Sequence, residues 1–163
     1  MPQILKIDPN ASLKVHSDHI REILSGGGVI AFPTDTYYGL GVSPFNKKGV
    51  HRVFEIKSRQ TNKPLLVLIS SEAQVDQLAQ NRSAEANVLI KKFWPAPLTL
   101  IFNAVPELPD ILTARTGKVG IRLPGNKWTR RLIEAVGCPL TATSANRNNE
   151  TNLRTAEEVA QVF

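Results

Sequence analysis

Hydrophobic and polar residues follow two spacings along the chain, one typical of helices and one typical of buried strands. Apolar residues at helical spacing, or capping residues in front of them, predict helices that begin at Ser17, Lys48, Ser71, Ser83, Asn126 and Thr155. Short apolar runs predict buried strands over residues 29–32, 65–69, 98–102, 119–123 and 139–143. Because helices and strands alternate, we expect an α/β fold with a twisted mixed sheet flanked by helices.

Some of these helices carry clear end signals. Ser17 is expected to cap the first helix, and the run Gly26–Gly28 to end it, because glycine accepts the left-handed C-cap geometry. Gly137 is expected to close the helix that begins at Asn126, and residues 155–158 form a capping-box pattern. The sequence contains no internal repeat, low-complexity tract or linker, so we expect residues 1–163 to form a single domain.

The composition is that of an ordinary globular protein, with 42% hydrophobic and 21% charged residues. No apolar run reaches about 18 residues, so the sequence predicts no membrane-spanning segment. The N-terminus lacks the charged-then-apolar pattern of a secretory signal. Cys138 is the only cysteine, which excludes a disulfide within this sequence and favours a reducing compartment. We therefore expect a cytoplasmic protein.

Positive charge is concentrated in two parts of the sequence. The formal net charge is +6. Six basic residues and no acidic one lie within residues 111–133, and six basic residues with Glu55 as the only acid lie within residues 36–71. Such segments favour anionic partners such as nucleotides or RNA. Two solvated faces of an ordinary basic protein are the alternative interpretation.

Several common catalytic motifs are absent from the sequence. Residues 120–127 do not form a P-loop, because Gly125 is followed by Asn126 and not by the required lysine with serine or threonine. The three histidines lack metal-ligand spacing, so no metal-ligating residue is predicted. Ser144 lacks the context of a hydrolase nucleophile.

Polar residues lie instead next to the predicted strands, where α/β proteins usually bind ligands. Thr36 follows the first strand, and Ser144 and Asn146 follow the last. Lys57 and Arg59 precede the second strand. For Thr36 and Ser144, simple turn capping is the alternative.

Arg122 differs from these residues because it lies inside a strand otherwise made of apolar residues and glycine. Burying a guanidinium is costly unless an anion or a carboxylate lies beside it. A bound anion meets this requirement, and so does an internal salt bridge with a carboxylate such as Asp35 or Glu55.

Five blocks of the sequence carry a resemblance to a known family. They are Pro33 to Gly41, Lys57 to Leu65, Trp94 to Leu100, Val119 to Pro124 and Pro139 to Asn146. In order and spacing these blocks resemble the YrdC-like threonylcarbamoyl-AMP synthase family. The resemblance implies a mixed α/β fold with a basic concave face. It also implies a nucleotidyltransferase that forms threonylcarbamoyl-AMP and pyrophosphate from L-threonine, bicarbonate and ATP, for the modification of tRNA.

By position, the resemblance also implies the site residues and partners. The catalytic signature comprises Lys57, Arg59, Ser144 and Asn146. The threonine-binding positions are Thr36 and Arg122. The ATP-binding positions are Arg59, Lys63, Lys118, Ala142, Ser144 and Asn152. Mg²⁺ is expected with ATP, and the expected partners are double-stranded RNA or tRNA and the machinery that transfers the threonylcarbamoyl group.

These residue types suit the implied reaction. A threonine carbamate attacks the α-phosphorus of ATP while pyrophosphate leaves, so the protein mainly positions anions and neutralises charge. Lys57 and Arg59 supply fixed positive charge. Ser144 and Asn146 offer neutral hydrogen bonds, and Arg122 can hold a carboxylate by two parallel ones.

Two other functions remain open. Similar domains occur in hydrogenase-maturation proteins that use carbamoyl phosphate, so a carbamoyl-transfer relative is one alternative. A non-catalytic RNA-binding module is the other, and it needs only the basic face. The sequence departs from the family pattern at Leu68, where many relatives have a histidine. It also departs at residues 148–151, which replace a Ser-Gly-x-Pro turn beside Asn152.

Overall fold

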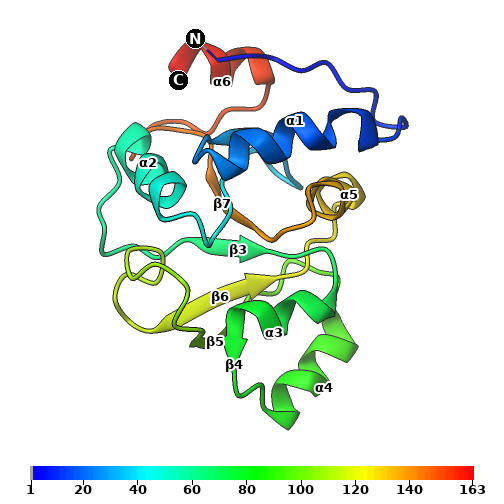
Figure 1. Ribbon diagram of the computed structural model, residues 1–163, viewed down its shortest axis with the longest axis vertical. Helices are drawn as coiled ribbons and strands as arrows, with labels where there is room; N and C mark the ends of the chain where they lie inside the picture. The colour runs from blue at the N-terminus through cyan, green and yellow to red at the C-terminus, as the bar shows by residue number, and fades with distance from the viewer. Residues whose placement is uncertain (1) are drawn as a thin grey trace.

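The structure is a computed structural model that describes residues 2–163. Its α-helices are α1 (Lys14–Ser25), α2 (Lys47–Lys57), α3 (Val75–Leu78), α4 (Ala84–Phe93), α5 (Lys127–Val136) and α6 (Ala156–Val162), with a 3-10 helix η1 (Glu72–Gln74) before α3. Its strands are β1 (Ile30–Pro33), β2 (Tyr38–Gly41), β3 (Leu66–Leu68), β4 (Ala79–Gln80), β5 (Leu100–Ala104), β6 (Lys118–Arg122) and β7 (Leu140–Ser144). Figure 1 places α6 and both chain ends at the opposite end of the molecule from α4.

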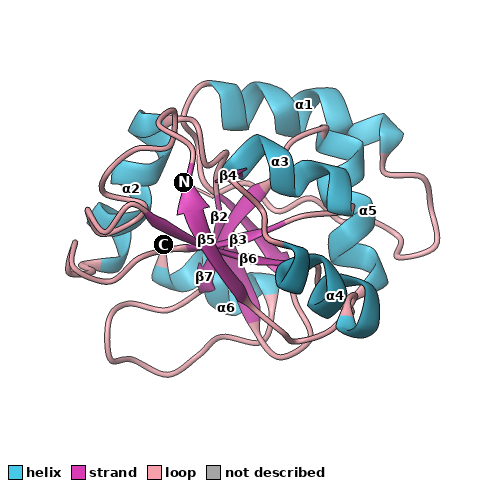
Figure 2. Cartoon of the chain, turned by 90° about the horizontal axis from the view of Figure 1, so that it is seen from below, coloured by secondary structure: helices cyan, strands magenta, loops and turns pink. Residues whose placement is uncertain are grey.

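The strands of the described residues form one seven-stranded sheet in the order β1-β2-β7-β3-β6-β5-β4. Strands β3 and β6 run parallel, and every other neighbouring pair is antiparallel. Figure 2 shows the strands in the centre of the molecule with the helices around them. The predicted α/β fold with a mixed sheet flanked by helices is confirmed.

One face of the sheet is covered by α2, α3 and α4. Val67 of β3 and Ile121 of β6 are fully buried there, in one cluster with Val53 of α2, Leu78 of α3 and Ile90 of α4. This cluster is the larger part of the core. It fixes the position of α2, whose last residue belongs to the candidate site.

The other face is covered only in part. Helices α1 and α5 pack on it through Ile20 and Leu132, which share a buried cluster with Phe32, Leu68 and Leu140 of the sheet. The buried sheet residues of this cluster come from β1, β3 and β7, and Leu66 and Ala142 pack against its edge. The side chains of β5 and β6 on this face lie outside the buried part of this cluster.

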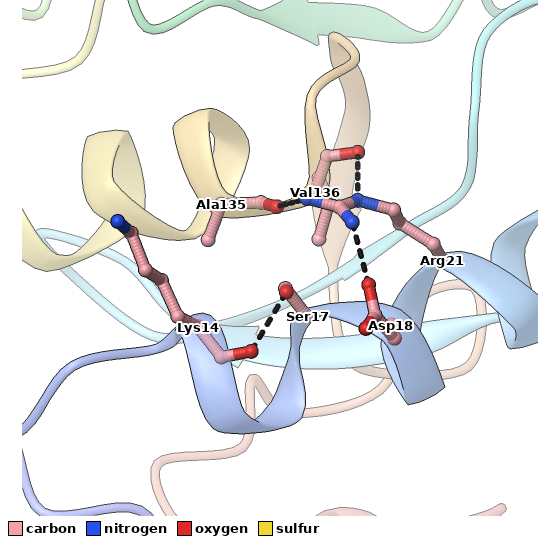
Figure 3. Close-up of polar contacts among 6 residues, drawn as sticks. All are labelled: Lys14, Ser17, Asp18, Arg21, Ala135 and Val136. Atoms are coloured by element: carbon pink, nitrogen blue, oxygen red, sulfur yellow. Dashed lines mark hydrogen bonds and ion pairs between the residues drawn. The ribbon is translucent and has the colours of Figure 1, made fainter.

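Helix α1 is attached to the end of α5 by Arg21. Its Nη2 donates to the carbonyl of Ala135 at 2.5 Å and its Nε donates to that of Val136 at 3.2 Å, as Figure 3 shows. The last carbonyls of a helix have no partner within the helix, so an arginine from a neighbouring helix stabilises that end. This contact holds the two helices of the partly covered face together.

The predicted start of α1 is wrong, whereas its predicted end at the run Gly26–Gly28 is confirmed. The helix begins at Lys14, and Ser17 lies inside it, where its hydroxyl donates to the carbonyl of Lys14 at 2.8 Å (Figure 3). Gly26 has a right-handed φ of −71°, and the left-handed residue is Gly27, with φ of 80°. Serine suits a helix interior when its hydroxyl bonds back to the preceding turn, which the sequence pattern does not distinguish from a cap.

Other differences come from short elements. The helix predicted from Ser71 is instead η1, α3 and the two-residue strand β4, and strand β2 was not predicted. Two glycines weaken the strand signal of β2. The predicted caps at Ser83, Asn126, Gly137 and Thr155 are confirmed, including the capping box at Thr155. No helix described over residues 2–163 is long and apolar enough to cross a membrane.

Candidate active site

The uncovered part of the sheet presents a defined row of side chains, which we call the open face. It comprises Leu66, Ile101, Asn103, Lys118, Gly120, Arg122, Ala142 and Ser144. Side chains alternate along a strand, and directly paired residues share a face. The strand registers pair Leu66 with both Gly120 and Ala142, and Asn103 with Lys118. The intervening residues Val119 and Ile121 are buried, which confirms the alternation.

The open face brings together four of the predicted substrate-binding residues. Lys118 and Arg122 lie on it from β6, and Ala142 and Ser144 lie on it from β7. Lys118 and Ser144 are exposed, while Arg122 and Ala142 are half-buried. Ile101 is 73% exposed, which is unusual for an apolar strand residue and shows that no other part of the described chain covers it.

Lys57, Ser144 and Asn146 form one hydrogen-bond network at the end of β7. The ammonium of Lys57 donates to the main-chain oxygen of Ser144, to that of Asn146 at 2.6 Å and to Asn146 Oδ1 at 3.1 Å. Ser144 Oγ donates to the same Oδ1 at 2.6 Å. Asn146 Nδ2 donates to the carbonyl of Glu150 at 2.5 Å. The network therefore fixes the loop that follows β7.

The Lys57 ammonium is fully occupied by these contacts. An ammonium has three N–H donors, and here each meets an oxygen of the protein. Lys57 is 2% exposed, and burial together with the nearby Arg59 charge lowers its pKa from 10.5 to about 8. A group held in this way positions the loop that carries Ser144 and Asn146.

Arg59 leaves the helix in a different direction from Lys57. Ser58 ends α2 in the left-handed conformation, with φ of 49°, so the chain turns sharply between the two cations. Arg59 Nη2 donates to the carbonyl of Pro64 at 3.1 Å and its Nε donates to that of Lys63 at 3.4 Å. Burial lowers the pKa of Arg59. Arg59 and the exposed Lys63 thus belong to one short loop before β3.

Arg122 has a neutral partner and no carboxylate. Its Nε and Nη2 donate to Thr99 Oγ1 at 3.0 and 2.8 Å. Within residues 2–163 the ion pairs are those of Arg21 with Asp18 and Arg82 with Asp76. The alternative of an internal salt bridge from Arg122 to Asp35 or Glu55 is therefore wrong for this structure.

Thr36 lies in the turn between β1 and β2. Its main-chain N–H donates to Thr34 Oγ1 at 3.3 Å, and its own side chain is exposed. Thr129 of α5 donates to the carbonyl of Pro33 at 3.1 Å, which holds this turn beside the start of α5. Helix α5 begins five residues after Arg122, so this contact links the turn to the segment that follows β6.

Asn152 is not brought into the network of Lys57, Ser144 and Asn146 by any hydrogen bond between described residues. It is half-buried in the segment before α6. The adjacent Leu153 accepts from the main-chain N–H of Tyr38 at 2.9 Å, which ties the segment to β2.

One cavity lies away from these residues. It has a volume of about 1160 Å³ between the N-terminal segment, α1, β1 and α6, and none of the predicted site residues lines it. Its lining is mainly apolar, whereas each of the implied substrates carries at least one negatively charged group. The polar and cationic side chains of the open face therefore make it the better candidate site for these substrates.

Three contacts of the site were missed in the sequence. They are the carbonyl of Glu150, which accepts from Asn146, and the side chains of Thr99 and Asn103 beside the cations of β6. Thr99 and Asn103 are four residues apart, as are Lys118 and Arg122. Once the antiparallel register is known, this matched spacing on neighbouring strands indicates that the two pairs of residues lie opposite each other.

The fold and the site define a mixed α/β protein whose cationic and polar side chains gather at one uncovered sheet face. Residues 22–163 match the model of the Sua5/YciO/YrdC family, described as telomere recombination. The chain belongs to this family. The resemblance inferred from the five sequence blocks is thereby confirmed.

Individual relatives agree with this assignment. The threonylcarbamoyl-AMP synthase of Pyrococcus abyssi is 36% identical over 151 residues, covering 93% of this chain and 43% of the relative. The crystal structure of P. abyssi Sua5 complexed with L-threonine has a TM-score of 0.83 and 34% identity, covering 91% of this chain and 44% of that one. The chain thus spans less than half the length of the first curated relatives it matches.

One similar structure bears on the carbamoyl-transfer alternative. A full-length HypF in the phosphate- and nucleotide-bound form has a TM-score of 0.75 at 21% identity, covering 94% of this chain and 23% of that chain. At this identity the likeness concerns the fold alone.

Proposed function

We propose that this chain forms threonylcarbamoyl-AMP from L-threonine, bicarbonate and ATP, with release of pyrophosphate. The observation that carries the proposal is the Lys57–Ser144–Asn146 network at the edge of an open face that presents Lys118 and Arg122. Relatives named threonylcarbamoyl-AMP synthase support it. Residues 1–163 would act as one catalytic unit, in the cytoplasm as the single cysteine suggests.

The proposed reaction has two steps. The threonine amine and bicarbonate first form a carbamate and water. A carbamate oxygen then attacks the α-phosphorus of ATP, and the bond from that phosphorus to the β-phosphate oxygen breaks to release pyrophosphate. Arg122 holds the threonine carboxylate by two parallel hydrogen bonds, and Thr36 contacts the amino acid. Holding both reactants in line supplies most of the acceleration.

The nucleotide would be held by cations and neutral donors. Arg59, Lys63 and Lys118 neutralise phosphate charge, and Ser144 donates without adding a competing charge. Ala142 offers a small surface beside Ser144. Asn152 is proposed as a further contact from the segment before α6.

Mg²⁺ would enter with ATP as part of the substrate. Residues 2–163 contain no group of three His, Cys, Asp or Glu side chains arranged to hold a metal ion. Mg²⁺ usually keeps several waters and is bound largely through substrate phosphates, which fits a site of neutral oxygens and cations. It would supply positive charge that neutralises the phosphates of ATP.

The product would pass to the machinery that transfers the threonylcarbamoyl group to tRNA. This product is a mixed carbamoyl–phosphoryl anhydride, which hydrolyses readily. Its rapid use by a partner therefore fits its chemistry.

The deciding experiment measures pyrophosphate release from Mg–ATP with and without threonine and bicarbonate. We expect release that requires both and is lost in Ser144→Ala. Lys48→Met, which changes an exposed lysine on α2, serves as a control and keeps the rate. Release that ignores threonine would overturn the proposal. Turnover with carbamoyl phosphate in place of threonine and bicarbonate would instead favour the carbamoyl-transfer alternative.

RNA binding is a second candidate, and the surface of α2 favours it. Lys47, Lys48, His51 and Arg52 line one surface depression with Glu55. The positive charges of Lys47, Lys48 and Arg52 attract phosphate regardless of base sequence. RNA bound there would leave the open face available for catalysis.

A further inference from the structure

Strands β5 and β6 pair their polar side chains across the open face. The antiparallel register places Asn103 opposite Lys118 and Leu100 opposite Ile121. One residue further, Thr99 comes opposite Arg122, and the hydrogen bonds between them agree with this register. Each cation of β6 on this face therefore has a neutral partner directly across from it on β5.

Thr99 fixes the direction of the Arg122 guanidinium. Its hydroxyl oxygen accepts from Nε and from one N–H of Nη2, which leaves three of the five guanidinium N–H groups free. The free groups lie on Nη1 and Nη2, the two nitrogens that donate in parallel to a carboxylate. Thr99 is uncharged, so it orients Arg122 without cancelling the charge that an anion needs.

Asn103 holds Lys118 in a similar way. The amide oxygen of Asn103 accepts from the Lys118 ammonium. A lysine has a long and flexible side chain, so a fixed acceptor reduces the conformational freedom that it would lose on binding a phosphate. Two of its three N–H donors remain free. Both side chains are exposed, so this contact contributes less than that of Thr99.

Gly120 keeps the space between the two cations clear. A Cβ at this position would lie 3.2 Å from Thr99 Cγ2 and 3.8 Å from Leu66 Cδ1. The methyl group of Thr99 thus packs against Gly120, which holds the hydroxyl toward Arg122. A side chain at residue 120 would displace Thr99 and occupy the surface between Lys118 and Arg122.

We propose that β5 carries two positioning residues, which act through the cations of β6 on different substrates. Thr99 orients Arg122 toward the threonine carboxylate, and Asn103 orients Lys118 toward the nucleotide phosphates. The proposal rests on the proposed function, since that function supplies the two ligands. Neither residue is expected to touch the reacting atoms.

The test compares the KM values for threonine and ATP in pyrophosphate release by the full chain. Thr99→Val keeps the shape and removes the hydroxyl, so the KM for threonine rises roughly tenfold while that for ATP stays within about twofold, as the loss of a hydrogen bond to a charged group requires. Thr99→Ser keeps the hydroxyl and restores the KM for threonine. Thr99→Ala is the second variant if Thr99→Val does not fold.

The Asn103 variants test the second part of the proposal, the orientation of Lys118 toward the nucleotide phosphates. Asn103→Leu removes the acceptor and raises the KM for ATP roughly threefold, with the KM for threonine unchanged, because the contact is exposed. Asn103→Asp keeps an acceptor but pairs its charge with Lys118, so it raises the KM for ATP more than Asn103→Leu does. The opposite selectivity of the Thr99 and Asn103 variants is a readout that general destabilisation does not produce.

The outcomes separate this proposal from the proposed function. A wild-type chain without threonine-dependent pyrophosphate release would defeat the function. An active wild type whose Thr99→Val variant loses threonine and ATP use equally, or is not rescued by serine, would overturn the positioning role. An Asn103→Leu variant with an unchanged KM for ATP would overturn the second half.

Discussion

The side chain of Lys57 joins the end of α2 to Asn146, which lies 89 residues later in the chain. Its ammonium donates to both the main-chain and the side-chain oxygen of Asn146. In the reverse direction, the main-chain N–H of Asn148 donates to the Lys57 carbonyl at 2.9 Å. The Lys-x-Arg and Ser-x-Asn segments therefore form one unit, and a change in either alters the other.

We expect Lys57→Met to loosen the loop of residues 146–150 and not only to remove a charge. The carbonyl oxygens of Ser144 and Asn146 lose their donor, so hydrogen exchange at the Asn148 amide speeds up roughly tenfold. Pyrophosphate release falls about a hundredfold. Exchange is measured by mass spectrometry or NMR, with the exposed Lys48→Met as the matched control. Unchanged exchange at Asn148 would contradict the positioning role of Lys57.

Activity is expected to fall as the pH rises through about 8, the lowered pKa of Lys57. The neutral amine has two N–H donors for three acceptors, so the network weakens above that pH. The folding stability from this group follows the opposite direction. Between pH values of about 8 and 10.5, Lys57 is protonated in the unfolded chain but mostly neutral in the folded one. The contribution of Lys57 to the free energy of unfolding therefore rises with pH in this range.

The pH profile of kcat/KM for pyrophosphate release, from pH 6.5 upward on the order of three units, checks this expectation. Asn146→Asp places a carboxylate beside the ammonium and raises the pKa of Lys57, which moves the alkaline fall to higher pH. A profile that stays flat beyond pH 9 or so would show that the charge of Lys57 is not needed.

Gly41→Ala is expected to destabilise the fold by roughly 2–3 kcal/mol. A Cβ at Gly41 would lie 2.5 Å from the carbonyl oxygen of Thr141 and 2.7 Å from Phe32 Cε1. The first is backbone of the neighbouring strand and cannot move without disturbing the sheet. Gly125→Ala is the control, since nothing lies within 4 Å of its added Cβ. Urea unfolding of the two variants should differ clearly, and equal midpoints would contradict the clash.

The close packing at Gly41 also explains why strand β2 was not predicted from the sequence. Strand β2 has glycines at positions 39 and 41 because Phe32 of β1 packs across them, and this contact between strands leaves no periodic signal within β2. Elements with strong local signals, such as α5 between its Asn126 cap and Gly137, were predicted within a residue or so. Local capping is read from sequence, but cross-strand packing is not.

The candidate site was also predicted only in part from the sequence. Lys57, Ser144 and Asn146 could be named from the sequence because their blocks resemble a family, and the structure brings them within hydrogen-bond distance. Their roles did not follow from residue type. The sequence does not distinguish a lysine that neutralises phosphate from a lysine that anchors a loop. The distinction for Lys57 comes from the three oxygen atoms that accept its hydrogen bonds. Thr99 remained unnoticed because its function depends on a register set by two strands.

Arg122→Lys is expected to raise the KM for threonine roughly tenfold or more, with the KM for ATP nearly unchanged. An ammonium cannot donate two parallel hydrogen bonds to a carboxylate, and it cannot also bond Thr99 from the same geometry. Substrate titrations of pyrophosphate release measure both constants. An equal loss for threonine and ATP would mean that Arg122 does not serve the amino acid in particular.

RNA binding, the last prediction, should depend steeply on salt and on α2. If Lys47, Lys48 and Arg52 each neutralise one phosphate, affinity falls about 40-fold between roughly 50 and 200 mM salt, whatever the RNA sequence. Replacing all three with glutamine removes most of this dependence, because each phosphate contact contributes about one unit of slope. Lys91 and Lys92 on α4, changed together, are the control. Fluorescence anisotropy with a labelled RNA duplex measures the slopes, and a flat response in the wild type would remove RNA from the partners.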